Sequence, residues 1–153
     1  MTTQTRPARS SDVRSLIEAD RVIVVEDDAD ARELTIVWLE HHGFVVTGAS
    51  GEGEALALLL ARPHDVAVID LHLGAGPVGV DLARRLRTTE ATRRMALVAV
   101  SARVDPDWSV VEPFDAYLRK PLDFDLLADL VRQLASANRA RDATARTGTV
   151  ETI

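Results

Sequence analysis

Charged and hydroxyl side chains stand at the ends of four short apolar runs in this sequence. They are Glu26, Asp27 and Asp28 after the first run, Asp70 and Ser101 at the ends of two later runs, and Lys120 after the last. Lys120 is the only lysine among eighteen basic residues. Such carboxylates could coordinate a hard divalent cation, because Mg²⁺ commonly takes one or two carboxylates together with phosphate oxygens.

The apolar runs read as buried strands that alternate with helices. Strands are predicted at 21–25, 44–49, 65–70, 96–101 and 114–119. Helices are predicted at 29–42, 50–62 and 80–87, with at most a short helix at 106–111 and a last helix after Asp123. The alternation predicts an α/β fold, a doubly wound five-stranded parallel sheet with helices on both faces. Ligands of such sheets bind outside the carboxyl ends of the strands, so the polar residues would meet at one edge.

We expect one domain, residues 21–135, with an extension at each end. In the N-terminal extension, residues 1–20, Ser11 could cap a short helix. Residues 136–153 are rich in Ala, Thr and Arg with little to bury, which predicts a flexible C-terminal tail. We expect this domain to stand alone, because the tail is too short for a DNA-binding domain.

Composition excludes several classes of protein. The chain is 46% hydrophobic, enough to fill a core, and its longest apolar runs are too short to span a membrane. Cysteine is absent, which excludes disulfides and thiolate metal sites and fits a cytoplasmic protein. The net charge of −6 and the scattered arginines argue against direct binding of DNA.

Gathering carboxylates at one sheet edge costs free energy that folding alone does not return. Two carboxylates about 4 Å apart repel by roughly 4 kcal/mol at an effective dielectric near 20, whereas a surface ion pair returns about 0–1 kcal/mol. Plainer roles exist for each residue alone: Asp28 or Asp30 could cap a helix, Ser101 could be a loop hydroxyl, and Lys120 a surface lysine. Complementary chemistry at four separate strand ends is better explained by a cation site.

The same residues resemble a known family, the response-regulator receiver domains of bacterial two-component signalling, in the single-domain, chemotaxis-regulator-like form. The matching motifs are VIVVEDD with its acidic pair, VAVIDLHL with the phosphoacceptor aspartate, AVSA with the switch hydroxyl, and YLRKPLD with an aromatic residue, a lysine and a proline. The resemblance covers residues 21–134 and implies a flavodoxin-like (βα)5 fold with strand order 2-1-3-4-5.

The resemblance also implies a role for each matched residue. Asp70 would accept a phosphoryl group from a phosphohistidine on a sensor histidine kinase or a histidine phosphotransfer protein. Lys120 and Ser101 would contact that phosphoryl group, and Tyr117 would follow Ser101 in a conformational switch. Mg²⁺ would be held by Glu26, Asp27, Asp70 and the backbone carbonyl of His72. The bond before Pro121 would be cis, as is typical in the family.

Lysine suits this site better than arginine. A compact ammonium on a flexible stem can move from the carboxylate to a phosphoryl oxygen, whereas the planar guanidinium is wider and less adaptable. The signal would pass to an unidentified downstream protein by contact, and a homodimer stays open as an alternative. Tyr117 could instead be a packing or binding residue. The chain would be a phosphoacceptor and not an enzyme.

Several positions depart from the family pattern. Gly74 stands where a proline is usual, and Gly79 comes one residue late, which indicates an insertion in the loop after Asp70. The segment between Ser101 and Lys120 is short, so its helix should be short or irregular and Trp108 could be exposed. The side chains of His72 and Arg103 occupy positions that tune the lifetime of the aspartyl phosphate in the family.

Other functions fit the residues less well. A phosphatase of the haloacid-dehalogenase type needs a second acid two residues after the nucleophile, where this chain has His72. A flavodoxin-like cofactor binder needs a phosphate-binding loop after the first strand, where EDDAD would repel phosphate. A receiver-like interaction domain that works without phosphorylation remains an alternative.

Overall fold

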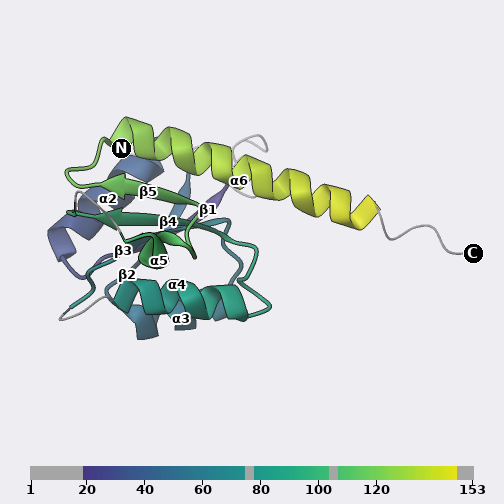
Figure 1. Ribbon diagram of the computed structural model, residues 1–153. Helices are drawn as coiled ribbons and strands as arrows, with labels where there is room; N and C mark the ends of the chain where they lie inside the picture. The colour runs from purple at the N-terminus through teal and green to yellow at the C-terminus, as the bar shows by residue number, and fades with distance from the viewer. Residues whose placement is uncertain (1–18, 75–77, 104–106, 148–153) are drawn as a thin grey trace, which may run out of the picture.

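The computed structural model describes residues 19–74, 78–103 and 107–147, and the predicted N-terminal helix lies outside these ranges. The strands are β1 Arg21–Val25, β2 Val45–Ala49, β3 Val66–Asp70, β4 Ala96–Ser101 and β5 Ala116–Arg119. The helices are α2 Ala29–His41, α3 Glu52–Ala61, α4 Val78–Thr88, α5 Trp108–Val111 and α6 Phe124–Thr147. The strands form one parallel sheet in the order β2-β1-β3-β4-β5, which confirms the predicted fold class (Figure 1).

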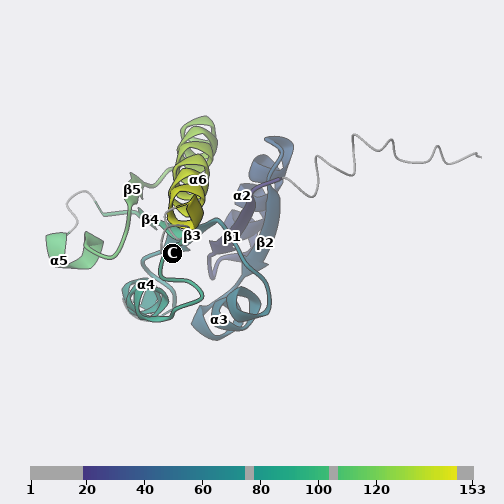
Figure 2. The same cartoon turned by 90° about the vertical axis from the view of Figure 1, so that its right-hand side faces the viewer.

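The sheet is buried on both faces by helices. Helices α2 and α6 cover one face, and α3 and α4 cover the other (Figure 2). Alternate residues of each strand point to opposite faces, so Ile23 joins one core and Val24 the other. Because the strands are buried on both faces, they appear in the sequence as uninterrupted apolar runs.

Helix α2 buries a different face from the one that its apolar spacing marked. In the sequence, the helix is indicated by Leu34, Val37, Trp38 and His41 at spacings of i, i+3, i+4 and i+7. Of these, Leu34 and Val37 are 53% and 55% exposed. The residues that pack inward are Thr35 and Leu39. Thr35 can be buried because its hydroxyl donates a hydrogen bond to the carbonyl of Ala31 at 2.8 Å. The apolar stripe therefore lies on the outer surface of the molecule.

Helix α6 corrects the prediction of a flexible tail from residue 136, since the helix continues to Thr147. It runs past the edge of the sheet as one straight rod (Figure 1). The amide of Asn138 donates to the carbonyl of Arg94 at 3.0 Å, and Arg139 forms an ion pair with Asp20. These contacts hold the first turns beyond residue 135 against the domain, and the Ala- and Arg-rich composition supports the helix itself.

Helix α5 is as short as the sequence indicated. It has four residues, none of them buried, and Trp108 is 83% exposed. In the described ranges, no helix is long and apolar enough to cross a membrane.

Candidate functional site

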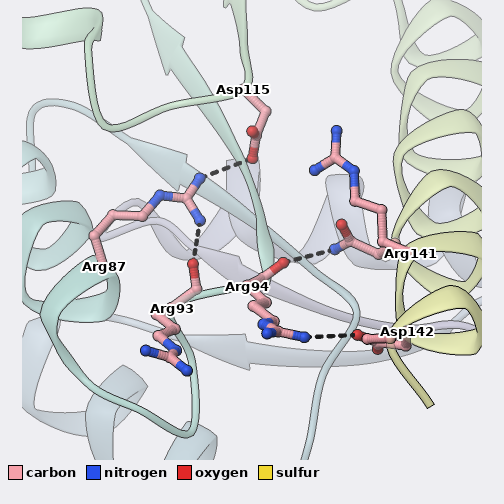
Figure 3. Close-up of a pocket in the computed structure, with 8 residues that line it drawn as sticks. Arg87, Arg93, Arg94, Asp115, Arg141 and Asp142 are labelled. Atoms are coloured by element: carbon pink, nitrogen blue, oxygen red, sulfur yellow. Dashed lines mark hydrogen bonds and ion pairs between the residues drawn. The ribbon is translucent and has the colours of Figure 1, made fainter. Parts of the chain in front are cut away.

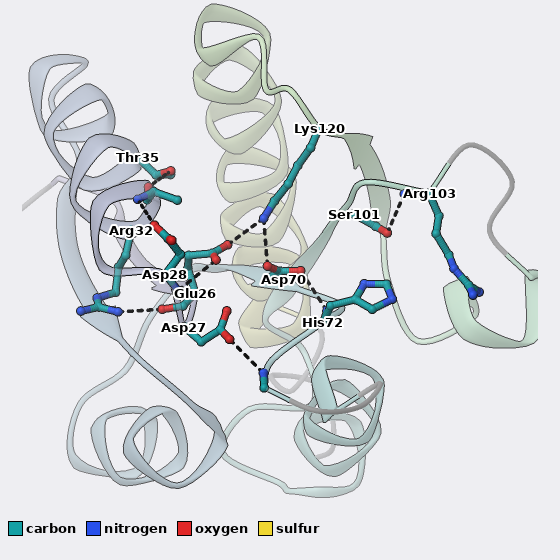
Figure 4. A network of polar contacts seen from close by, with 12 residues as sticks. Glu26, Asp27, Asp28, Arg32, Thr35, Asp70, His72, Ser101, Arg103 and Lys120 are labelled. Atoms are coloured by element: carbon teal, nitrogen blue, oxygen red, sulfur yellow. Dashed lines mark hydrogen bonds and ion pairs between the residues drawn. The ribbon is translucent and has the colours of Figure 1, made fainter.

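The strand ends bring three acidic side chains together at one edge of the sheet. Glu26 and Asp27 follow β1, and Asp70 ends the neighbouring strand β3. A carboxylate oxygen of each lies within 4.8 Å of the others (Figure 4). Asp28, the next acid in the chain, instead caps α2 and accepts a hydrogen bond from the backbone N–H of Ala31 at 2.8 Å.

Lys120 reaches this cluster from the end of β5. Its Nζ donates to Asp70 Oδ2 at 2.9 Å and to Glu26 Oε2 at 3.1 Å. The Asp70 and Glu26 side chains are buried, while Lys120 keeps about a third of its side-chain surface in water. The peptide bond between Lys120 and Pro121 is cis. One cation therefore faces three carboxylates, and the site carries a net negative charge.

Burial and the excess of negative charge shift the pKa values of the cluster. Burial, and next the hydrogen bond with Asp70, raise the pKa of Glu26 to about 7, although Lys120 opposes the shift. Burial disfavours the charged form of Lys120, but its bonds to Asp70 and Glu26 outweigh this and raise its pKa. The backbone N–H of Gly74 lowers the pKa of Asp27. Glu26 is thus partly protonated near neutral pH, and a metal ion would displace that proton.

The loop after Asp70 is shaped by two glycines. Gly74 has a φ of +71°, and its N–H donates to Asp27 Oδ2 at 3.0 Å. Gly79 lies against the backbone of Asp70, because a Cβ there would come 2.2 Å from the Asp70 carbonyl oxygen. Gly74 thus holds the Asp27 side chain, and Gly79 allows the start of α4 to lie against the backbone of Asp70.

The predicted switch residues lie beside the cluster, on β4 and β5. Ser101 is fully buried, and its Oγ accepts a hydrogen bond from the backbone N–H of Arg103 at 3.1 Å. The Tyr117 hydroxyl points outward and donates to the carbonyl of Arg103 at 2.9 Å. A small cavity of about 60 Å³ separates Tyr117 from the Ser101 side of the site.

The two predicted rate-tuning residues lie at the rim of the site. The backbone N–H of His72 donates to Asp70 Oδ1 at 2.9 Å, while its imidazole points away from the carboxylates (Figure 4). The Arg103 guanidinium also points away from Asp70.

Sequence reasoning missed Arg32. Its Nη1 donates to the backbone carbonyl of Glu26 at 2.8 Å and so helps to position the acidic pair. Its position in the sequence, in the first turn of the helix that follows the acidic pair, could have indicated this contact.

The donor set fits Mg²⁺. Three carboxylates are hard oxygen ligands, and their mutual repulsion is only partly offset by Lys120. Asp27 is exposed, so the cluster is open to solvent on one side, where a magnesium ion could keep part of its water shell.

Comparison with known proteins identifies the family of the chain and agrees with its fold. Residues 22–132 match the family model of the response regulator receiver domain. The transcriptional regulatory protein CseB of Streptomyces avermitilis is 32% identical over 117 residues, which cover 76% of this chain and 49% of that protein. The chain spans half or less of the length of the first curated relatives it matches.

Solved structures show the same architecture. A CheY-like receiver domain from Methylobacillus flagellatus matches with a TM-score of 0.70 at 30% identity, covering 76% of this chain and 99% of that one. The regulator TrrA of Thermotoga maritima, in complex with Mg²⁺ and BeF, has the same fold with a TM-score of 0.68 at 23% identity, covering 75% of this chain and 98% of that one. The family model and the fold agree, and the chain belongs to the response regulator receiver domain family.

Proposed function

We propose that this chain accepts a phosphoryl group on Asp70 from a phosphohistidine of a sensor histidine kinase or a histidine phosphotransfer protein. The observation that carries the proposal is the geometry of Asp70, which ends a central strand with Lys120 on one carboxylate oxygen and the His72 N–H on the other. A carboxylate held in this way is fixed in orientation, which favours in-line attack.

In the reaction, a carboxylate oxygen of Asp70 attacks the phosphorus of the phosphohistidine. A P–O bond forms, the P–N bond breaks, and its electron pair returns to the imidazole of the partner, which takes up a proton from water. Lys120 stays beside the transferred group and interacts with one of its oxygens. Glu26, Asp27, Asp70 and the backbone carbonyl of His72 would hold Mg²⁺, which supplies positive charge to the transferring phosphoryl group.

The response would follow from Ser101 and Tyr117. A phosphoryl oxygen on Asp70 gives the Ser101 hydroxyl a new acceptor, and Ser101 moves toward it from its contact with the Arg103 backbone. Tyr117 would then leave the carbonyl of Arg103 and turn toward the cavity beside Ser101. The surface formed by α5, β5 and α6 changes as a result, and a downstream protein reads that change by contact. The side chains of His72 and Arg103 would set how long the phosphoryl group survives.

The exposed stripe of α2 supports docking of the phosphohistidine-bearing partner. Leu34 and Val37 lie on the outer face of α2, and the Trp38 ring packs 5.7 Å from the ring of Phe124 at the start of α6. A shallow pocket of about 150 Å³ runs from Leu34 and Phe124 to Lys120. An apolar surface next to the acceptor would seat the partner beside Asp70.

Intact mass after incubation with acetyl phosphate tests the proposal. We expect a single phosphoryl adduct with Mg²⁺ present, which is lost with EDTA and in Asp70→Asn. The matched control is Asp81→Asn, which neutralises an exposed aspartate of α4 and should leave the adduct unchanged. An absent adduct in the wild type, or an adduct that persists in Asp70→Asn, would reject Asp70 as the acceptor. Absence of both the adduct and Mg²⁺ binding would favour a receiver-like interaction domain that works without phosphorylation.

A further inference from the structure

A second polar site lies at the opposite end of the sheet from Asp70. There the extension of α6 and the loop before β4 border a cleft of about 420 Å³. Four arginines and two aspartates line it: Arg87, Arg93, Arg94, Arg141, Asp115 and Asp142. In Figure 3, Arg87 and Arg93 approach from one side, while Arg141 and Asp142 extend from α6 on the other. The lining has an excess of two positive charges in a chain whose net charge is −6.

The walls of the cleft are fixed by hydrogen bonds. Arg87 forms an ion pair with Asp115 at 2.8 Å and donates to the carbonyls of Met95 and Pro113 at 2.7 and 2.9 Å. Asn138 of α6 donates to the carbonyl of Arg94 at 3.0 Å. The cleft therefore exists before any ligand binds, and binding would require little further ordering of its backbone.

Two of the four arginines form no ion pair within the described ranges. Arg94 is 3.7 Å from Asp142, but the guanidinium groups of Arg93 and Arg141 have no acidic partner within the described ranges. Both side chains are exposed at the cleft. Positive charges gathered from two segments far apart in the sequence repel each other, so the fold gains nothing from placing them together.

We propose that this cleft binds a small anion of the phosphate class, with two or more negative charges, such as pyrophosphate. Arginine forks bind phosphate oxygens through paired hydrogen bonds, and the volume suits a small molecule. Ala145 is the only apolar residue of the lining. The cleft thus lacks an aromatic surface for stacking a nucleobase and an apolar anchor for a protein partner. The ligand is recognised by its charge and oxygens, and Arg93 and Arg141 supply the two unpaired guanidinium groups.

Isothermal titration calorimetry with sodium pyrophosphate, at low ionic strength and with EDTA, tests the site. We expect a dissociation constant below about 1 mM for the wild type, weakened about tenfold or more by the double substitution R93Q/R141Q. The matched control is R84Q/R85Q, which removes two exposed arginines of α4 that lie outside the cleft and should leave the affinity within about twofold. Circular dichroism checks that both variants fold. Asp70→Asn should bind pyrophosphate as the wild type does, which separates this site from the acceptor.

Three outcomes would overturn the proposal. The wild type could show no binding heat at millimolar pyrophosphate. Both double variants could weaken binding equally, which would mean that the total charge of the chain attracts the anion. A glutamate-rich peptide could bind the wild type and resist displacement by pyrophosphate, which would assign the cleft to a protein partner.

Discussion

Replacing Lys120 by methionine removes the cation that forms ion pairs with the carboxylates of Asp70 and Glu26. The substitution leaves Asp70 and Glu26 buried without the ammonium that lies 2.9 and 3.1 Å from them. Breaking a buried ion pair by removing one partner costs about 3–5 kcal/mol. Because Lys120 is 32% exposed, we expect the lower end of that range, about 3 kcal/mol, at pH 8 without metal.

The loss should be smaller at pH 6. The raised pKa of Lys120 keeps the ammonium charged at both pH values, so Lys120 itself titrates only above this range and the pH dependence comes from its partner Glu26. Glu26, with a pKa of about 7, is mostly protonated at pH 6 and repels Asp70 less. We expect the destabilisation to fall to about half, and Mg²⁺ at pH 8 to restore much of it by replacing the lost positive charge.

Urea unfolding followed by circular dichroism, at both pH values and with EDTA or Mg²⁺, measures these differences. The control is Arg119→Met, which removes an exposed positive charge one residue earlier and should change the free energy of unfolding by less than about 0.5 kcal/mol. Equal losses in the two variants, or a Lys120→Met loss that is the same at pH 6 and pH 8, would refute the electrostatic account of the cluster.

Two further predictions concern the same site. In urea unfolding, Gly79→Ala should destabilise the domain by about 3 kcal/mol or more, because its Cβ would lie 2.2 Å from the backbone carbonyl oxygen of Asp70, which cannot rotate away. The control is Gly53→Ala, whose Cβ meets nothing within 4 Å. It should stabilise helix α3 by about 0.5–1 kcal/mol. The affinity for Mg²⁺ should rise as pH increases from 6 to 8, because Glu26, with its pKa of about 7, must lose a proton when the ion binds. Calorimetry in buffers of different ionisation heat would detect that proton, and a flat pH profile would contradict the protonation of Glu26.

The sheet and the acidic cluster were predictable because one physical constraint produces both signals. Strands buried on both faces must be apolar along their whole length, so polar residues such as Asp70 and Ser101 stand out where a strand ends. Parallel strands share one carboxyl edge, so their ends converge without further information.

The faces and contacts of the helices were less predictable. Helix α2 has apolar residues on more than one side, and the sequence does not show that Thr35 can satisfy its own hydroxyl and pack inward in place of Leu34. The length of α6 depends on partners in distant segments, such as Asp20 and the carbonyl of Arg94. Its polar composition alone resembles that of a disordered tail.

The four-residue helix α5 has a consequence for dynamics. Because none of its residues is buried, opening this turn would expose little apolar surface and leave the sheet intact. Its amide hydrogens should therefore exchange with deuterium far faster than those of β3 and β4, whose residues are all buried. Local opening at low free-energy cost allows a modest stimulus at the neighbouring strand ends to shift a large fraction of the molecules between conformations.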